Sequence, residues 1–416
     1  MNKVKLGEIA EIQAGPFGTQ LHKSEYVTDG IIMLNAKNIG NGEILLDDID
    51  CVSENVCERL SMYVLREGDI LFGRAGSIER HTYVSEEYAG SFQGTNCIRI
   101  RCKTIEEAIY VSYYLWLPQV KKLIENKTGG SVLSYITTDL LKEIIIELPN
   151  NNTILSIDRL LYTIDEKRRL NCKINDNLQH QLKLMHDYWF TQFDFPDENG
   201  KPYQTSGGKM SVNNILKKNI PESWCVQSVY SNRLSSIIKP GVDQFDTKTY
   251  LATADVKGTS ISAGTLIDYE NRENRANMQP SVNSVWFAKM KNSIKHLYLN
   301  KEMLPIISSS VLSTGFCGLQ CNEVSFEYIA SYISNSYFEI HKDMLAHGAT
   351  QEAVNNDDLI SIHLVIPDDR VLHAYHNTAQ PLYAQISKNI CENKELVKLR
   401  DWLLPMLMNG QATISD

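Results

Sequence analysis

The sequence lacks the features that mark a secreted or membrane-spanning protein. Its nine cysteines are an odd number, and no two of them form a Cys-x-x-Cys pair. The longest apolar runs, such as Ile144-Ile145-Ile146, fall far short of the roughly 18–20 residues of a membrane helix. No apolar signal-peptide segment follows Met1. We therefore expect a cytoplasmic chain without a membrane segment and with reduced thiols.

The motifs of common catalytic and metal sites are also missing. Gly207-Gly208-Lys209-Met210 has neither the spacing nor the hydroxyl of a phosphate-binding loop. Neither His-Glu-x-x-His nor Gly-x-Ser-x-Gly occurs. Cys317 and Cys321 are poorly spaced for a metal and have no His pair nearby. Asp47-Asp48-Ile49-Asp50 is better interpreted as a solvated acidic loop than as a metal site. We therefore expect a chain that is not an enzyme and binds no metal.

The composition is that of an ordinary folded protein. With 416 residues, 43% of them hydrophobic and 22% charged, the chain is long enough for about two or three domains with sizeable cores. The net charge of −9 argues against nonspecific coating of nucleic acid. It is compatible with site-specific DNA contact through a local basic face.

The chain repeats itself at a constant offset. Gly130 and Pro149 recur as Gly348 and Pro367, because 348 − 130 and 367 − 149 both equal 218. The same offset relates further tyrosines and asparagines, namely Tyr110 and Tyr114 to Tyr328 and Tyr332, and Asn171 and Asn175 to Asn389 and Asn393. Such coincidences of unlike residue types predict two copies of one structural unit.

Each copy begins with short strand-like runs and ends in a long helix. Runs such as Gly68–Phe72 and Val285–Ala288 are bounded by turn residues, and helical stretches are expected at 105–124 and 325–345. This mixture predicts an α+β fold.

The long helix of the first copy shows an apolar stripe from Ile154 to Trp189 in steps of three and four residues. No Pro or Gly interrupts it, and about 40 residues would span about 60 Å, which favours a coiled coil. In the second copy, Pro381 is expected to kink or delay the helix. Asn171 and Asn389 fall on the stripes, where they either fix the pairing register or face solvent.

Several short segments together resemble the DNA-specificity subunits of type I restriction–modification enzymes. They are Gly68-Asp69-Ile70-Leu71-Phe72, Ile220-Pro221-Glu222-Ser223-Trp224, Leu148-Pro149, Ile366-Pro367, Tyr188–Pro196 and Leu399–Pro405. The resemblance implies two similar mixed α/β target recognition domains joined by two long antiparallel helices with a pseudo-two-fold internal repeat. The implied boundaries are 1–150 for the first domain, 151–195 for its helix, 196–218 for a linker, 219–367 for the second domain and 368–410 for its helix.

The resemblance also implies a function. Each domain would read one half of a split DNA sequence, and the helices would space the domains and bind two methyltransferase subunits. Those subunits would hold S-adenosylmethionine and methylate adenine at N6, whereas this chain would need no cofactor. Restriction subunits, where present, would cleave the DNA. No Asn/Asp-Pro-Pro-Tyr/Phe motif of such a methyltransferase occurs in the chain. A coiled-coil scaffold without DNA recognition, and a methylation-only defence system, remain alternatives.

Candidate DNA-contacting residues are Arg or Lys for guanine and phosphate, and Asn or Gln for adenine, in predicted loops. The candidates are Lys37, Asn38, Arg74, Arg80, Gln93, Asn96, Arg272, Arg275, Lys289, Lys291 and Lys295. Arg74 is preferred because it follows Gly68–Phe72 directly. For each of them an ordinary surface role is the alternative. Phe17 is expected to fill a turn in the core rather than to pack on DNA.

Candidate partner-binding residues lie near the ends of the two long helices. They are Trp189, Phe190, Trp402 and Leu403. Large aromatic side chains there would either anchor a methyltransferase subunit or close the coiled coil within the chain.

Overall fold

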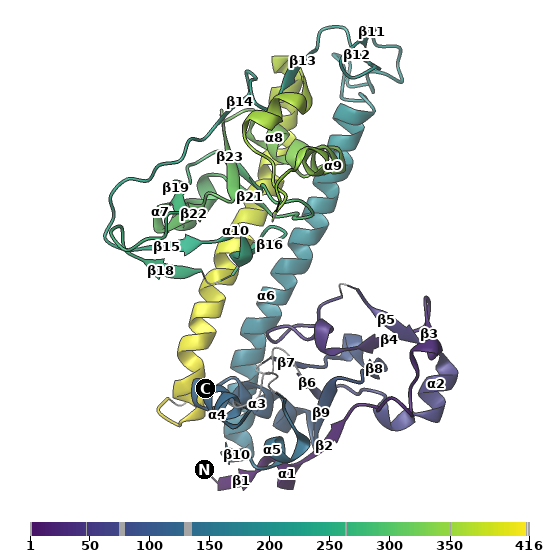
Figure 1. Ribbon diagram of the computed structural model, residues 1–416, viewed down its shortest axis with the longest axis vertical. Helices are drawn as coiled ribbons and strands as arrows, with labels where there is room; N and C mark the ends of the chain where they lie inside the picture. The colour runs from purple at the N-terminus through teal and green to yellow at the C-terminus, as the bar shows by residue number, and fades with distance from the viewer. Residues whose placement is uncertain are drawn as a thin grey trace. The chain divides into compact units, whose positions relative to one another are not determined.

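The computed structural model describes residues 2–46, 48–74, 80–128, 135–262, 264–349, 351–412 and 414. The chain forms two compact units (Figure 1). Unit 1 consists of Met1–Glu166 with Val397–Asp416, and unit 2 consists of Lys167–Leu396. Among the described residues, no helix is long and apolar enough to cross a membrane.

Unit 1 contains two four-stranded sheets and a two-stranded one. The first sheet is antiparallel, in the order β2 (Ala10–Ala14), β9 (Cys97–Cys102), β6 (Ile70–Gly73) and β7 (His81–Tyr83). The second has the order β3 (Tyr26–Val27), β5 (Asp50–Val52), β4 (Ile31–Leu34) and β8 (Phe92–Gln93), with β4 and β8 parallel. The strand β1 (Asn2–Lys5) pairs with β10 (Ile145–Leu148). The α-helices that precede β10 are α1 (Leu6–Ile9), α2 (Glu54–Arg59), α3 (Ile105–Leu115), α4 (Pro118–Thr128) and α5 (Thr138–Lys142).

Unit 2 repeats this arrangement. Its first sheet has the order β14 (Ser235–Ile237), β23 (Phe316–Cys321), β20 (Ser284–Ala288) and β21 (His296–Leu299). Its second has the order β18 (Thr265–Ile267), β15 (Lys248–Leu251), β22 (Ser310–Ser313) and β19 (Ala276–Met278), with β15 and β22 parallel. The strand β13 (Cys225–Ser228) pairs with β24 (His363–Ile366). Smaller elements are β11 (Met210–Asn213), β12 (Lys218–Pro221), β16 (Val256–Lys257), β17 (Ser260–Ile261), α7 (Leu304–Ser309), α8 (Phe326–Ile333) and α9 (Ser336–Leu345).

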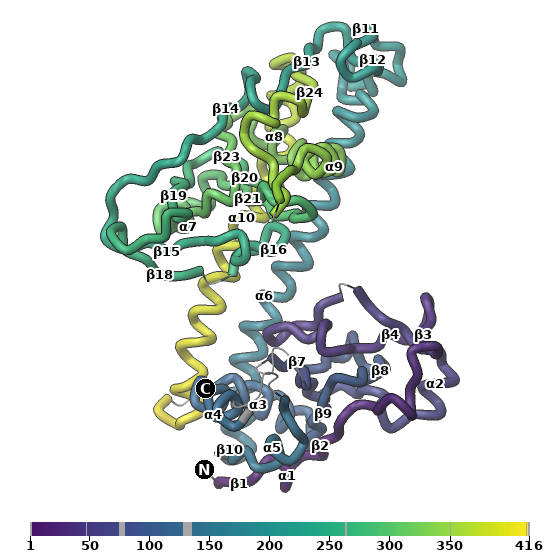
Figure 2. The backbone as a smooth tube through the Cα atoms, viewed as in Figure 1, coloured from purple at the N-terminus to yellow at the C-terminus, as the bar shows by residue number. Residues whose placement is uncertain are grey.

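The predicted repeat is therefore confirmed at the level of the fold. Strands β10 and β24 begin at Ile145 and His363, and 363 − 145 is again 218. The two sheet orders and the parallel strand pair recur in both units, as the tube view shows (Figure 2). Of the sequence anchors, Gly130 lies outside the described residues. Each predicted helical stretch is in fact two short helices, because Pro118 begins α4 and the Asn335 side chain caps α9.

The two long helices are α6 (Asn151–His186) and α10 (Asp369–Met408). Their 36 and 40 residues correspond to about 54 and 60 Å. Each follows a capping residue, since Asn150 Oδ1 accepts the Thr153 amide at 2.9 Å and Asp368 Oδ1 accepts the Val371 amide at 2.9 Å. The caps are also 218 residues apart, so the two helices begin for the same local reason.

One expectation about α10 was wrong. Pro381 neither delays nor ends the helix, which begins at Asp369 and continues through Pro381 to Met408. The proline removes one backbone hydrogen bond. Tyr375, Ala379 and Tyr383, on both sides of it, are at most 2% exposed in the core of unit 2. Their packing offsets the lost bond and keeps the chain helical.

Within unit 2, α6 and α10 run antiparallel and are joined by buried amides. Asn171 Nδ2 donates to Asn393 Oδ1 at 3.0 Å and to Glu392 Oε2 at 2.6 Å. One turn further along α6, Asn389 Nδ2 donates to Asn175 Oδ1 at 2.8 Å. Asn171, Asn175 and Asn389 are at most 6% exposed. The solvent-facing alternative is thereby excluded, and the register of the pair is set by directed hydrogen bonds.

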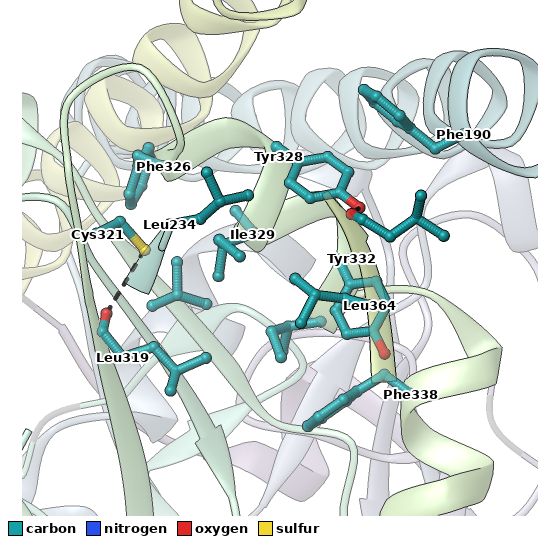
Figure 3. Packing of buried hydrophobic residues seen from close by; sticks show 14 of the residues in the cluster. Phe190, Leu234, Leu319, Cys321, Phe326, Tyr328, Ile329, Tyr332, Phe338 and Leu364 are labelled. Atoms are coloured by element: carbon teal, nitrogen blue, oxygen red, sulfur yellow. Dashed lines mark hydrogen bonds between the residues drawn. The ribbon is translucent and has the colours of Figure 1, made fainter. Parts of the chain in front are cut away.

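The core of unit 2 joins these helices to the sheet and to α8 (Figure 3). The Phe190 ring, in a π-helical turn at Asp187–Thr191 directly after α6, lies 4.6 Å from Tyr328 and 4.8 Å from Tyr375. Tyr328 donates from its hydroxyl to the Val365 carbonyl of β24. In unit 1, Ile154, Ile157 and Leu161 of α6 pack in one core with Leu404, Leu407 and Met408 of α10.

The amide layer yields a stability prediction. Replacing Asn389 alone by Leu leaves the buried amide of Asn175 without its 2.8 Å partner, at a cost of about 1–3 kcal/mol. The double change Asn175→Leu and Asn389→Leu removes both polar groups and should regain much of that loss. Urea unfolding of the full chain compares the two variants. A single variant as stable as the parent would contradict the assigned register.

Candidate nucleic-acid interface

Each unit presents one hairpin loop that begins and ends with a cation. In unit 1 the loop between β6 and β7 runs from Arg74 to Arg80, and in unit 2 the loop between β20 and β21 runs from Lys289 to Lys295. Both loops are seven residues long by these numbers. Residues 75–79 lie outside the described part of the chain. The four cations are among the residues that sequence reasoning proposed.

The first residue of each loop is held by the same two backbone bonds. The Arg74 amide donates to the Asn96 carbonyl at 2.8 Å, and its carbonyl accepts the Ile136 amide at 3.1 Å. The Lys289 amide donates to the Gly315 carbonyl at 2.9 Å, and its carbonyl accepts the Val354 amide at 3.0 Å. Both side chains are half-buried. The fold therefore fixes where each cation leaves the backbone.

Around Arg74, unit 1 gathers an exposed aromatic ring and an amide. The Arg74 guanidinium lies 5.3 Å from the centroid of the Phe17 ring, which is 53% exposed. The expectation that Phe17 fills a turn in the core was wrong. Gly15 lies so close to Gly94 that a Cβ would stand 2.0 Å from the Gly94 carbonyl oxygen, so the backbone turns away there and leaves Phe17 outside. Asn96 is exposed beside this turn.

Around Lys289, unit 2 gathers further basic residues. The Arg275 carbonyl accepts the Thr314 amide at 2.8 Å, and Thr314 precedes the Gly315 that binds Lys289. The Arg275 side chain is exposed. Arg272 is half-buried, with its guanidinium 3.9 Å from the Tyr269 ring centroid and donating to the Tyr269 carbonyl at 2.5 Å. Arg275 and Lys289 therefore flank one turn, whereas Arg272 is held by its own loop.

Three of the proposed lysines have local partners. The Lys37 ammonium lies 2.8 Å from Asp48 and 3.1 Å from Asp50, and the hydrogen bond to Asp48 raises its pKa. Asp47 lies outside the described residues. Lys291 pairs with Glu352 at 2.7 Å, and the Lys295 ammonium donates to the Thr253 carbonyl at 2.5 Å.

The remaining polar candidates in unit 1 divide by exposure. Asn38 and Gln93 are fully buried. The Asn38 amide donates to the Leu45 carbonyl at 2.9 Å, and the Gln93 amide donates to the Gln13 carbonyl at 3.1 Å. Both side chains hold the backbone, and we leave them out of the proposed DNA contacts. Arg80 is exposed directly before β7.

The four partner-binding candidates also differ. Trp189 and Phe190 are 8% and 4% exposed, and their rings contact Tyr375 in unit 2. They close the core within the chain, which was the stated alternative. In unit 1, Leu403 is half-buried against the core, and Trp402 is 63% exposed. Only Trp402 among the four offers a largely exposed apolar surface.

Within unit 2, α6 carries an exposed apolar row that the sequence analysis did not single out. Leu170, Ile174 and Leu184 are 49%, 45% and 56% exposed. Their separations of 4 and 14 residues are close to one and four helical turns, so the three lie on one face. In the sequence they interleave with the apolar residues that face α10, which hid this second face.

Comparisons with known proteins decide the family. Residues 1–180 match the family "Type I restriction modification DNA specificity domain". The chain is 22% identical to the specificity subunit of the type I restriction enzyme MjaIX of Methanocaldococcus jannaschii, over 99% of this chain and 93% of that protein. The fold matches the crystal structure of the type I restriction–modification S subunit from M. genitalium, with a TM-score of 0.52, 14% identity, and coverage of 98% and 95%.

The chain belongs to the type I restriction–modification specificity subunits. A second such subunit, of the HindI enzyme of Haemophilus influenzae, is 20% identical over 92% of this chain and 94% of its own length. Specificity subunits are the DNA-recognition members of type I enzymes and are not catalytic. Over the described ranges, no three His, Cys, Asp or Glu residues are grouped to hold a metal.

Proposed function

We propose that this specificity subunit reads a bipartite DNA sequence, one half with each unit, and directs adenine-N6 methylation by two methyltransferase subunits. The observation that carries the proposal is the duplicated hairpin loop with a cation at both ends. On a chain of net charge −9, the same two backbone bonds hold a basic side chain at the start of both loops. Arg or Lys on a loop contacts guanine or phosphate in the major groove.

The differences between the loops support two unlike half-sites. Unit 1 has Arg74 next to Phe17 and Asn96, whereas unit 2 has Lys289 next to Arg275 and a glycine turn. A planar guanidinium can bind guanine through two hydrogen bonds, whereas an ammonium acts as a point charge. S-adenosylmethionine would be held by the methyltransferase subunits, and cleavage would need restriction subunits. On this proposal the protein acts on DNA in the cytoplasm.

A prediction for the two loops uses charge reversal. Arg74→Glu should change the bases accepted in one half of the motif, and Lys289→Glu should change those in the other half, because each cation belongs to one unit. Lys122→Glu and Lys301→Glu reverse exposed lysines of units 1 and 2 as controls. Single-molecule sequencing of native DNA, from a host carrying the chain with its methyltransferase, gives the methylated motif. A motif unchanged by both loop variants would overturn the proposal.

A second prediction concerns the long helices, which both run through the two units. Deleting 166–169 together with 395–398 removes one turn from each helix but keeps the Asp165–Arg400 and Asn171–Asn393 pairs. About 6 Å is lost, close to the rise of two base pairs, so the spacer between the half-sites should shorten by about two base pairs. Alanine at the same eight positions is the length-preserving control. An active deletion variant with the original spacer would contradict the spacing role.

A third prediction concerns the exposed row on α6, which we propose binds a methyltransferase subunit. Leu170→Asp with Ile174→Asp should abolish co-purification of the methyltransferase and lower methylation, while the melting temperature changes little because both side chains are about half exposed. Leu266→Asp on β18, at a position 73% exposed, is the control. Full co-purification by the double variant would show that the methyltransferase binds elsewhere.

A further inference from the structure

We propose that a buried ionic network formed by Glu339 and Lys342 of α9 with His296 positions the β20–β21 loop and so determines which bases unit 2 accepts. The inference rests on the proposed function, because it assigns a role to residues beneath a DNA-reading loop. None of the three would touch DNA, so they are positioning residues.

Lys342 is the centre of the network. Its side chain is fully buried, and its ammonium donates to Glu339 Oε2 at 2.6 Å and to the Ser293 carbonyl at 3.1 Å. Asp343 Oδ1 lies 3.7 Å away. An ammonium has three donors, so these three oxygens match its hydrogen-bonding capacity. Ser293 lies inside the loop, which means that a buried charge holds the loop backbone directly.

Two further contacts join α9 to the same loop. Glu339 Oε1 lies 2.8 Å from Nε2 of His296, the first residue after the loop. Asp343 Oδ1 accepts the Asn292 amide at 3.2 Å, where Asn292 has a positive φ of 55°. Glu339, Lys342 and Asp343 are three and four residues apart and therefore share one face of α9. This face contacts the loop and its end at three nearby positions.

The chemistry of the network is costly unless the geometry matters. Buried ion pairs lose hydration, and apolar side chains of similar size often stabilise a core as well or better. Burial alone would raise the pKa of Glu339, but the bonds from His296 and Lys342 outweigh it and lower that pKa. Glu339 is therefore held as a carboxylate. Directed bonds to a carbonyl and an imidazole fix a loop in one place, which apolar packing does less well.

Unit 1 supports its loop differently. His81, at the start of β7, stacks on Phe72 and Trp116 with centroids 4.7 and 4.1 Å apart, and the Lys121 ammonium lies 4.1 Å over the Trp116 ring. At the offset of 218, Lys121 corresponds to Glu339, and Ile124 corresponds to Lys342. The ionic network therefore belongs to unit 2, and its loss should affect one half of the motif.

The test uses the full chain expressed with its methyltransferase, and native DNA is sequenced as above. Lys342→Met keeps the aliphatic stem, and Glu339→Leu with Lys342→Met replaces the ion pair by apolar groups, so that a folded variant is available. Each should relax base discrimination in the unit 2 half by about tenfold, comparable to the value of one bidentate base contact, and leave the other half unchanged. Glu327→Gln is the matched control, because Glu327 forms a buried 2.7 Å pair with His376 in the same unit.

The outcomes separate positioning from simple stability. Relaxation confined to the half that Lys289→Glu alters, with the motif of Glu327→Gln intact, supports the inference. Equal loss of methylation over the whole motif, with a lowered melting temperature as in the control, overturns it. An unchanged motif in the Lys342 variants overturns it while Lys289→Glu still acts. If Lys289→Glu has no effect either, the proposed function fails as well.

Discussion

The register between α6 and α10 is the constraint on which the rest of unit 2 depends. The buried amides of Asn171, Asn175 and Asn389 find partners at one register only, because a shift along the helices would leave them unsatisfied in the interior. The same register brings Phe190 against Tyr375 and Tyr328. The sheet and α8 pack on those rings, so a few hydrogen bonds between helices determine where the β-rich part can attach.

Much of this architecture can be predicted from the sequence because it depends on local periodicity. The offset of 218 residues, the capped starts at Asn150 and Asp368, and the apolar stripes follow from short-range rules. Pro381 shows where such rules fail. Its effect depends on the packing of Tyr375 and Tyr383, which is set by residues far away in the chain. Tertiary packing offset a local penalty, and the sequence alone does not reveal that balance.

The candidate interface was only partly predictable for a related reason. Residue type and loop position pointed to Arg74 and Lys289, but the same reasoning included Asn38 and Gln93, whose amides are buried. Exposure depends on which loops cover which, and the sequence does not give this. Phe17 was misjudged because the close approach of Gly15 to Gly94 joins distant segments. The match of Arg74 with Lys289 has an offset of 215, so it is hidden from a search at 218.

The two units show how one fold can serve two specificities. The backbone bonds that hold Arg74 and Lys289 are the same, so the point at which a cation emerges belongs to the shared scaffold. What lies beneath the loops differs, with a stack of aromatic rings in unit 1 and an ionic network in unit 2. Neither support uses residues of the other unit. Substitutions in one loop, or under it, can therefore change one half of a recognised sequence while the helices and the other half stay as they are.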